Sequence, residues 1–340
     1  MNLYCHFPFC RRKCPYCALH SRVGVSSADK AAYVARLARA LKARLGRQDA
    51  PTPFKTVYFG GGSPALCDLS PLFDALAPAL APDAEFTVEL HPLDVTPSTL
   101  ATLKAGGVNR VSMGVQSLDD KCLIRMGRGY TADDAAKAFA RVRHVFDNAG
   151  IDLIVGYPGA REIPCRSLKD WGIRHASVYS LMLERGTALA AAVATGRETL
   201  PAPDDTLDKL ARASSDLAAL GLERYEISNY ACAGFACRHN LAVWRGEDYI
   251  GLGEGAYGRE GLVRTRDGLL VETLSPLEDL KERTVFALRT RDGLDATRFP
   301  AWRDTLDFFV AQGLLKGAFP RYRLTARGTE VCDAILADLV

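Results

Sequence analysis

The chain has 340 residues, 48% of them hydrophobic, and a net charge of +3 with both signs interspersed. This length suits one large α/β domain, or a large domain with a smaller one, and it allows a sizeable core. No apolar run reaches the roughly 18 residues of a membrane-spanning helix, and no block of like charge indicates nucleic-acid binding. Met1 leads into a strand-like stretch without a signal peptide, so we expect a cytoplasmic protein.

Short apolar strands alternate with amphipathic helices through the first half of the chain. The strands are predicted around Leu3, Tyr58, Val88, Met113, Ile154 and Val178. Residues 31–45 carry apolar side chains at helical spacing, with Ser27 or Asp29 as the N-cap. A second helix follows Thr131 and is expected to end at Gly150. Six strands with intervening helices favour parallel pairing in a barrel or a doubly wound sheet.

The pattern becomes looser after about residue 185. Pro201 and Pro203 mark a break, after which residues 206–220 are typical of a helix. From about Leu277 we expect helices and, within residues 314–328, a pair of short strands. These features predict a core of residues 1–230 and a smaller α+β C-terminal domain of residues 231–340.

Three of the ten cysteines form the pattern C-x3-C-x2-C, namely Cys10, Cys14 and Cys17. In a reducing compartment such a cluster indicates a metal site or catalysis, not a disulfide. Three thiolates would bind three irons of a four-iron, four-sulfur cluster and leave one iron open to an outside ligand. A tetrahedral zinc site that also uses His6 or His20 is the alternative.

Other polar and glycine residues follow the predicted strands. Gly60, Gly61 and Gly62 come after the second strand, Glu89 after the third and Gln116 after the fourth, whereas Asp152 opens the fifth. In parallel α/β folds, ligands bind at the carboxyl ends of the strands. We therefore expect these residues to share a site with the cysteine loop.

Several motifs together resemble the radical S-adenosylmethionine (SAM) superfamily. They are YxHxPFCxxxCxYC at residues 4–17, GGGSP at 60–64, GVQS at 114–117 and YEISNYA at 225–231. The resemblance extends to about Leu336, and it is to the branch that holds oxygen-independent coproporphyrinogen III oxidase and the HemW-type haem chaperones. It implies a partial (β/α)6 barrel over residues 1–230 and a HemN-type C-terminal domain over residues 231–340.

The resemblance also implies cofactors. Cys10, Cys14 and Cys17 would hold a [4Fe-4S] cluster whose open iron binds the amino and carboxylate groups of SAM. One electron from the cluster, supplied by a reducing donor, would then cleave the sulfonium of SAM.

Further positions match the family one by one. Tyr16 would pack near the adenine, although a plain core aromatic is the alternative. Gly61, Gly62 and Ser63 would approach the methionine end of SAM, although a GGG sequence can also be a mere turn. Positions that contact SAM in the oxidase are matched by Tyr4 and Glu89. Polar positions around a second SAM site are matched by Gln116, Arg128 and Asp152, of which Arg128 and Asp152 could instead form a structural ion pair.

Two departures separate this chain from the oxidase. The oxidase has a fourth cysteine two residues after the third, where this chain has Leu19. The oxidase also has an extension before its first strand, whereas this chain has nine residues before Cys10. Both departures favour the chaperone.

A haem motif is carried by residues 237–244, CRHNLAVW, which resemble HNxxYW of HemW-type proteins. His239 would ligate the haem iron, since neutral imidazole is a good axial ligand. A hydrogen-bonded structural histidine is the alternative, and Cys237 is a possible substitute ligand. Val243 replaces the usual tyrosine and Tyr257 a usual histidine, residues 18–21 read ALHS where DFNS is usual, and the segment 158–175 is shorter than expected.

The sequence therefore predicts a HemW-like radical SAM protein that binds a cluster, SAM and haem and passes haem to an acceptor protein. The resemblance suggests a respiratory, membrane-associated acceptor, which leaves peripheral association with the inner membrane open. We expect no nucleic-acid partner. The alternatives are a radical enzyme such as the oxidase and a non-catalytic zinc or interaction protein.

Overall fold

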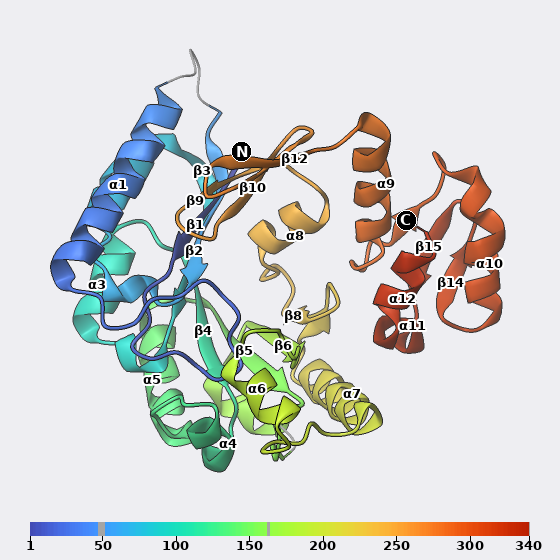
Figure 1. Cartoon of the computed structure of the whole chain (residues 1–340), viewed down its shortest axis with the longest axis horizontal. Helices are drawn as coiled ribbons and strands as arrows, with labels where there is room; N and C mark the ends of the chain where they lie inside the picture. Colours follow the sequence, from blue (N-terminus) through green and yellow to red (C-terminus); the bar gives the residue numbers. More distant parts are fainter. Residues whose placement is uncertain (47–51, 162–163, 340) are drawn as a thin grey trace.

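The computed structural model describes residues 1–46, 52–161 and 164–339 (Figure 1). One large sheet contains β1 (Asn2–Phe7), β2 (Phe54–Gly61), β3 (Leu80–Leu90), β4 (Arg110–Gln116), β5 (Asn148–Val155), β6 (His175–Ser180), β7 (Glu223–Arg224), β8 (Asn229–Ala231), β9 (Tyr249–Leu252), β10 (Tyr257–Glu260), β11 (Val263–Arg266) and β12 (Leu269–Thr273). Its strand order is β12-β11-β10-β9-β1-β2-β3-β4-β5-β6-β8-β7. β1 to β6 are parallel and neighbour one another in chain order. This arrangement is the predicted partial (β/α)6 barrel.

The helices cover this sheet and build the C-terminal part. They are α1 (Ser27–Leu45), α2 (Ser70–Leu76), α3 (Pro97–Ala105), α4 (Asp120–Arg125), α5 (Ala132–Val145), α6 (Ala188–Ala194), α7 (Pro203–Ala219), α8 (Arg238–Trp244), α9 (Pro276–Ala287), α10 (Arg303–Ala311), α11 (Ala326–Glu330) and α12 (Cys332–Ala337). The apolar face of α1 is buried against the sheet as predicted, and α1, α3 and α5 lie along one side of the molecule (Figure 1). Because these helices lie along the side of the sheet, the carboxyl ends of its strands are free to form the site.

Three local predictions are corrected. Ser26, not Ser27 or Asp29, caps α1, because its side chain accepts a hydrogen bond from the backbone N–H of Asp29. The helix α5 begins at the predicted Thr131 cap but ends at Val145, so Gly150 lies inside β5. A Cβ on Gly150 would lie 2.8 Å from the carbonyl oxygen of His175, so this glycine allows β5 and β6 to approach. Asp152 is consequently in the middle of β5 and does not open it.

The crossover between β5 and β6 is short. In the part of this crossover that the structure describes, the helical element is a 3-10 helix, Cys165–Trp171, with Cys165 and Leu168 buried. This short element lies in the segment 158–175, which is shorter than the family resemblance implies. Farther along the chain, α7 begins at Pro203 and covers all but the last residue of the predicted helix 206–220.

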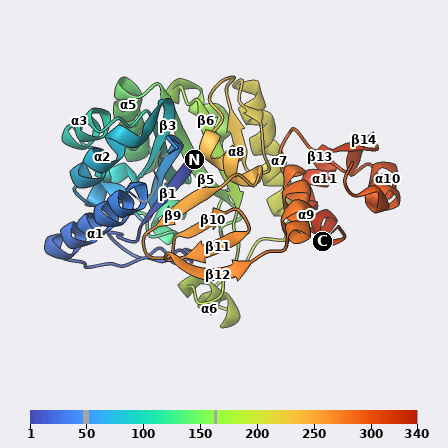
Figure 2. The ribbon, with the colours of Figure 1, turned by 90° about the horizontal axis from the view of Figure 1, so that it is seen from above.

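The last third of the chain has two parts. Strands β9 to β12 extend the large sheet, with β9 parallel to β1 and the others antiparallel. Beyond them, α9 to α12 pack with β13 (Leu294–Asp295), β14 (Leu315–Ala318) and β15 (Arg321–Leu324) around a separate core (Figure 2). The predicted strand pair is β14 and β15. The division at residues 230 and 231 stays a prediction, since the large sheet continues beyond it.

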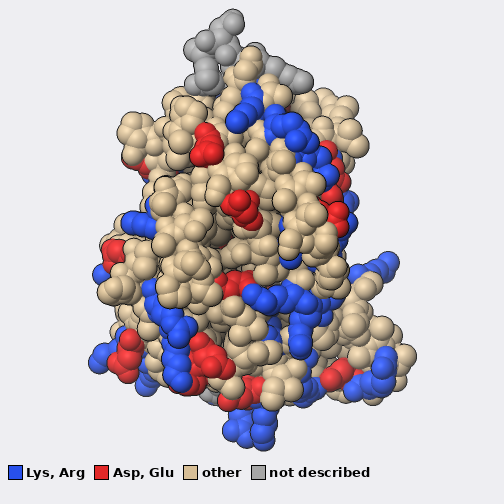
Figure 3. All heavy atoms as spheres, turned by 90° about the vertical axis from the view of Figure 1, so that its left-hand side faces the viewer, with Lys and Arg blue, Asp and Glu red and all other residues tan. Residues whose placement is uncertain are grey.

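The surface carries mixed charge. Figure 3 shows acidic and basic side chains interspersed over the face on the side of α1 and α3, so the net charge is not gathered there. None of the helices in the described ranges is long and apolar enough to cross a membrane.

Candidate cofactor site

The cysteine loop follows β1 and is fixed at both ends. The N–H of Cys10 donates to the carbonyl of Arg22 at 2.9 Å, which closes the loop at its base. Phe9 is buried beside this closure and packs edge-on against Tyr33 at a ring distance of 5.1 Å. The N–H of Cys17 donates to the carbonyl of Cys14 at 3.2 Å, which forms the turn between the last two cysteines. The thiols of Cys10, Cys14 and Cys17 are therefore attached to a backbone that these hydrogen bonds hold in place.

Cys10, Cys14 and Cys17 line one cavity of about 740 Å³ at the carboxyl ends of the strands. Burial, and after it the neighbouring thiols of Cys17 and Cys14, raise the pKa of the Cys10 thiol to about 11. Within the described residues, no three His, Cys, Asp or Glu side chains have the arrangement that holds a single metal ion. A cubane binds each thiolate at a different iron, so its ligands need not converge on one point.

The three glycines at the end of β2 each leave room for a specific neighbour. A Cβ on Gly62 would lie 2.5 Å from the carbonyl oxygen of Phe9 and 2.9 Å from the sulfur of Cys10. Gly61 has a φ of +106°, and its Cβ would lie 2.5 Å from the ring of His6. These glycines therefore allow the cysteine loop to pack directly on the end of β2.

The backbone donors of this glycine segment are already used. The N–H groups of Gly61, Gly62 and Ser63 donate to Glu89 Oε2, to the Phe7 carbonyl and to the Phe9 carbonyl. These three N–H groups are therefore not free to bind a ligand.

Glu89 lies at the end of β3 and faces the cavity. Its Oε1 accepts a hydrogen bond from the Tyr58 hydroxyl at 2.8 Å, and its Oε2 accepts one from Gly61 N–H at 3.0 Å. Burial and then the charge of Asp152 raise the pKa of Glu89 to about 7, although these two hydrogen bonds oppose the shift. The carboxyl group can therefore gain or lose a proton near neutral pH.

This pKa predicts a pH dependence of stability. The folded protein binds the Glu89 proton up to a higher pH than the unfolded chain does. The stabilising contribution of Glu89 to the unfolding free energy is therefore lost as pH rises from about 4.5 to about 7. The difference in unfolding free energy between wild type and Glu89→Gln should fall with pH in that window, by at most about 1.4 kcal/mol per pH unit. Urea unfolding of the reduced, cluster-free proteins measures it, and a pH-independent difference would contradict the assignment.

Gln116 and Arg128 form the polar wall at the end of β4. Gln116 has a φ of +68° at an irregularity of the β4–β5 pairing, which turns it out of the regular strand. The guanidinium of Arg128 donates to Gly114 O at 2.8 Å, to the Tyr130 hydroxyl at 2.9 Å and to the Cys14 sulfur at 3.4 Å. A fixed cation thus lies beside one of the three thiols.

Asp152 also lines the cavity but is not paired with Arg128. Its carboxylate accepts a hydrogen bond from the Ser112 hydroxyl at 3.0 Å, and burial raises its pKa. No ion pair joins it to Arg128 in the part of the chain that the structure describes, so the structural-pair alternative is not supported. Both side chains are available to a ligand in the cavity.

The two predicted tyrosines differ in position. Tyr16 lines the cavity and packs edge-on against Tyr157 at 6.0 Å between ring centroids, and its packing near the adenine stays a prediction. Tyr4 does not line the cavity, and its hydroxyl is 3.0 Å from His6 Nδ1. Tyr4 therefore adjoins the site through two neighbours, His6, which packs under Gly61, and Tyr58, whose ring centroid lies 6.1 Å from that of Tyr4.

His239 lies outside the cavity, at the start of α8. Its side chain is 4% exposed, and its Nδ1 is 2.8 Å from the Thr56 hydroxyl. Burial and then the charge of Arg110 lower its pKa to about 3, which keeps it neutral. Ligation of haem by His239 stays a prediction, and it would require α8 to move from β2. Cys237 is fully buried, and burial raises its pKa to about 12, which disfavours the thiolate.

The structure adds residues that the motifs did not indicate. Asp94 is buried beside the cavity, where it accepts hydrogen bonds from Ser63 and from Arg11. The cavity also has exposed apolar side chains, which are Leu19, Leu93, Tyr179 and Met182. The sequence indicates only weakly that these four apolar residues belong to a site, because isolated apolar residues in loops are common on protein surfaces.

Comparison with known proteins assigns the chain to a family. Residues 4–169, which contain the cysteine loop and β1 to β5, match the sequence model of the Radical SAM superfamily. The whole chain is 33% identical to a Mycobacterium tuberculosis protein named heme chaperone HemW, of which it covers 94%. It is 32% identical to heme chaperone HemW of Bacillus subtilis, with 99% of this chain and all of that protein covered.

The chain belongs to the HemW-type family of radical SAM proteins. The structure of this HemW-type chain is similar to coproporphyrinogen III oxidase HemN from Escherichia coli, with a TM-score of 0.81 over 99% of this chain and 89% of that one. The identity to HemN is 21%, so this likeness shows the fold alone. The predicted family and fold are confirmed.

Proposed function

We propose that this HemW-type protein binds a [4Fe-4S] cluster through Cys10, Cys14 and Cys17, binds SAM next to it, and carries haem to an acceptor protein. The observation that carries the proposal is a single cavity shared by the three thiols, the glycine end of β2 and the polar ends of β3 to β5. The chaperone names of the full-length relatives support the haem part.

The chain's donors fit the cluster. Three thiols supply three ligands and leave one iron for SAM. The Arg128 guanidinium contacts the Cys14 sulfur at 3.4 Å, and Gly62 leaves space at the Cys10 sulfur. When reduced, the cluster would supply one electron for cleavage of the SAM sulfonium.

The remaining cavity residues would orient SAM. Carbonyl oxygens of the glycine segment and the Glu89 carboxylate suit the amino group of the methionine moiety, whereas Arg128 and Gln116 suit a carboxylate. Asp152 lines the same cavity and, together with Gln116 and Arg128, would form the predicted second SAM site, whereas Tyr16 offers a ring for the adenine.

The apolar side chains of the cavity would contact haem. Met182 is 70% exposed and Leu19 is 52% exposed, and a flat apolar macrocycle would remove both from water. The cavity contains one imidazole among its described lining residues, His91, whose pKa burial and then the nearby arginines lower to about 3. A neutral imidazole is the form that ligates iron, so we propose His91 as the cavity-side candidate beside the motif-based candidate His239.

The experiment that tests the proposed function uses one anaerobically reconstituted sample for two assays. Haem titration should saturate and give a Soret band, and the loaded protein should transfer haem to an apo-haem protein. Incubation with SAM, reductant and coproporphyrinogen III should give no decarboxylated product, because Leu19 stands where the oxidase has a cysteine. Appearance of the divinyl product without haem transfer would favour the oxidase instead.

A charge at the apolar wall should weaken haem binding. Met182→Asp puts a carboxylate where the macrocycle would bury apolar surface, so haem affinity should fall about tenfold or more. Ile124→Asp is the matched control, since Ile124 is 75% exposed on α4 and does not line the cavity. Equal affinities of the two variants would place haem elsewhere. His91→Ala and His239→Ala, measured alongside, identify the ligand by the Soret shift.

A further inference from the structure

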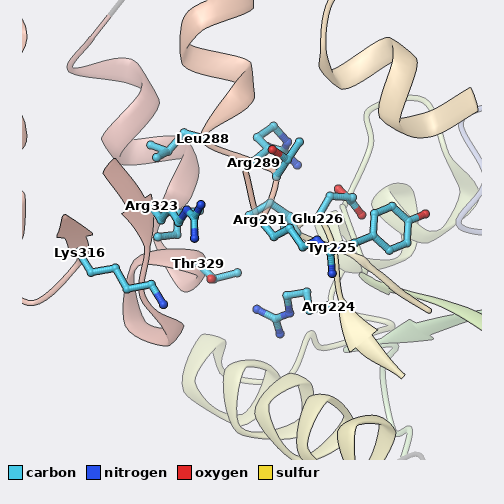
Figure 4. A pocket seen from close by; sticks show the side chains of 12 residues that line it. Arg224, Tyr225, Glu226, Leu288, Arg289, Arg291, Lys316, Arg323 and Thr329 are labelled. Atoms are coloured by element: carbon cyan, nitrogen blue, oxygen red, sulfur yellow. The ribbon is translucent and has the colours of Figure 1, made fainter. Parts of the chain in front are cut away.

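A second pocket of about 290 Å³ lies between the barrel and the C-terminal part, away from the cofactor cavity (Figure 4). One wall comes from the β7–β8 turn, and the opposite walls come from the segment after α9 and from β14 and β15. The two sides are joined by backbone, since the N–H of Arg291 donates to the carbonyl of Tyr225 at 3.0 Å. The pocket is therefore built from both parts of the chain.

Basic residues dominate its lining. They are Arg224, Arg289, Arg291, Lys316 and Arg323, against a single acidic residue, Glu226. The Glu226 Oε1 accepts hydrogen bonds from Ser228 N–H and from the Asn229 side chain, and no ion pair within the described residues joins Glu226 to any of the five cations. Arg289 is paired with Asp333 and Arg291 with Glu223, so three of the cations, Arg224, Lys316 and Arg323, have no ion pair among the described residues.

Two of the cations face each other directly. Lys316 on β14 and Arg323 on β15 are opposite residues in the antiparallel register, so their side chains lie on the same face. Like charges at such a position destabilise a strand pair. No ion pair compensates Lys316 or Arg323 within the described residues. An anion between them would relieve the repulsion.

Arg289 adds a buried donor. One end of its guanidinium pairs with Asp333 at 2.9 Å, and its plane lies 4.5 Å from the centre of the Trp244 ring, which fixes the side chain. Its Nε is buried and has no hydrogen-bond partner in the described structure. A buried unpaired donor is costly unless a bound group satisfies it.

We infer that this pocket binds a phosphate dianion, either free phosphate or a phosphate monoester. A dianion with three or four acceptor oxygens matches a pocket of several guanidinium and ammonium donors better than a single carboxylate, because each cation can receive its own oxygen. Since the donors come from both sides of the junction, the bound anion links the C-terminal part to the barrel.

The test measures binding of inorganic phosphate and of ribose 5-phosphate to the full-length, cluster-loaded protein by calorimetry at constant ionic strength. Wild type should bind at least one of the two, and Lys316→Gln and Arg323→Gln should each weaken that binding about tenfold or more. Arg298→Gln, which removes the same charge from an exposed residue outside the pocket, should bind as wild type does. The tighter of the two ligands identifies free phosphate or an organic phosphate as the source.

A thermal measurement separates ligand binding from a structural role. In phosphate-free buffer, Lys316→Gln should have a Tm equal to or above that of wild type, because it removes the cross-strand repulsion. With phosphate present, wild type should gain more in Tm than the variant. No binding by wild type, or equal binding by wild type and the pocket variants, would overturn the inference.

Discussion

Cys14→Ala should lose most of the iron that wild type retains after anaerobic reconstitution with iron and sulfide. Removing this thiol leaves two of the three protein ligands and leaves the Arg128 guanidinium without its sulfur contact. Two thiolates hold a cubane poorly, so the visible absorption of the cluster should largely disappear. Iron and sulfide analysis together with the absorption spectrum measures the loss.

The matched control is Cys67→Ala. Cys67 is also a partly buried free thiol, but it does not line the cavity. Its replacement should leave the iron content unchanged. If Cys14→Ala held as much iron as Cys67→Ala, the three-cysteine site would be refuted.

Gly62→Ala should impair both folding stability and cluster assembly. The new Cβ would lie 2.5 Å from the Phe9 carbonyl oxygen, 2.8 Å from the Phe7 carbonyl oxygen and 2.9 Å from the Cys10 sulfur. The two carbonyls are backbone atoms at the end of β1 and the start of the anchored loop, so they can move only with this backbone. Overpacking of this kind costs about 1–3 kcal/mol, and here the strain falls on a cluster ligand.

Denaturant unfolding of the cluster-free protein and iron content after reconstitution measure the two effects. Gly46→Ala is the control, because its Cβ would have its nearest contact at 3.4 Å, with the Lys42 carbonyl oxygen at the end of α1. The control should match wild type in iron content. Normal stability and normal iron content in Gly62→Ala would show that the loop does not pack on β2 as described.

Much of the fold follows from the sequence. The apolar runs at β1 to β6 and the periodic helices between them predict parallel strands, whereas the order of a partial barrel followed from the family resemblance. The prediction that Gly150 ends a helix is wrong. A glycine after a helical stretch is typical of a helix C-terminus, but here Gly150 allows close contact with His175 on the next strand. That contact depends on tertiary packing, which local sequence does not encode.

The sequence likewise predicts some parts of the site and not others. The cysteines and strand-end residues converge because the carboxyl ends of parallel strands share an edge. Motif spacing could not show that Glu89 is held by Tyr58, or that Asp94 supports Ser63, because those partners come from other strands and loops. It also could not show that His239 is enclosed by Thr56 on β2, since burial is a property of the packed fold.

The central claim is that three thiols hold a cubane with one iron open towards the cavity. Mössbauer spectroscopy of the anaerobically reconstituted wild-type protein, recorded before and after addition of SAM, tests it most directly. The account predicts a [4Fe-4S] spectrum in which one iron site changes its isomer shift when SAM is added and three do not. A well-reconstituted sample with no cubane, or with four iron sites that SAM leaves unchanged, would contradict it.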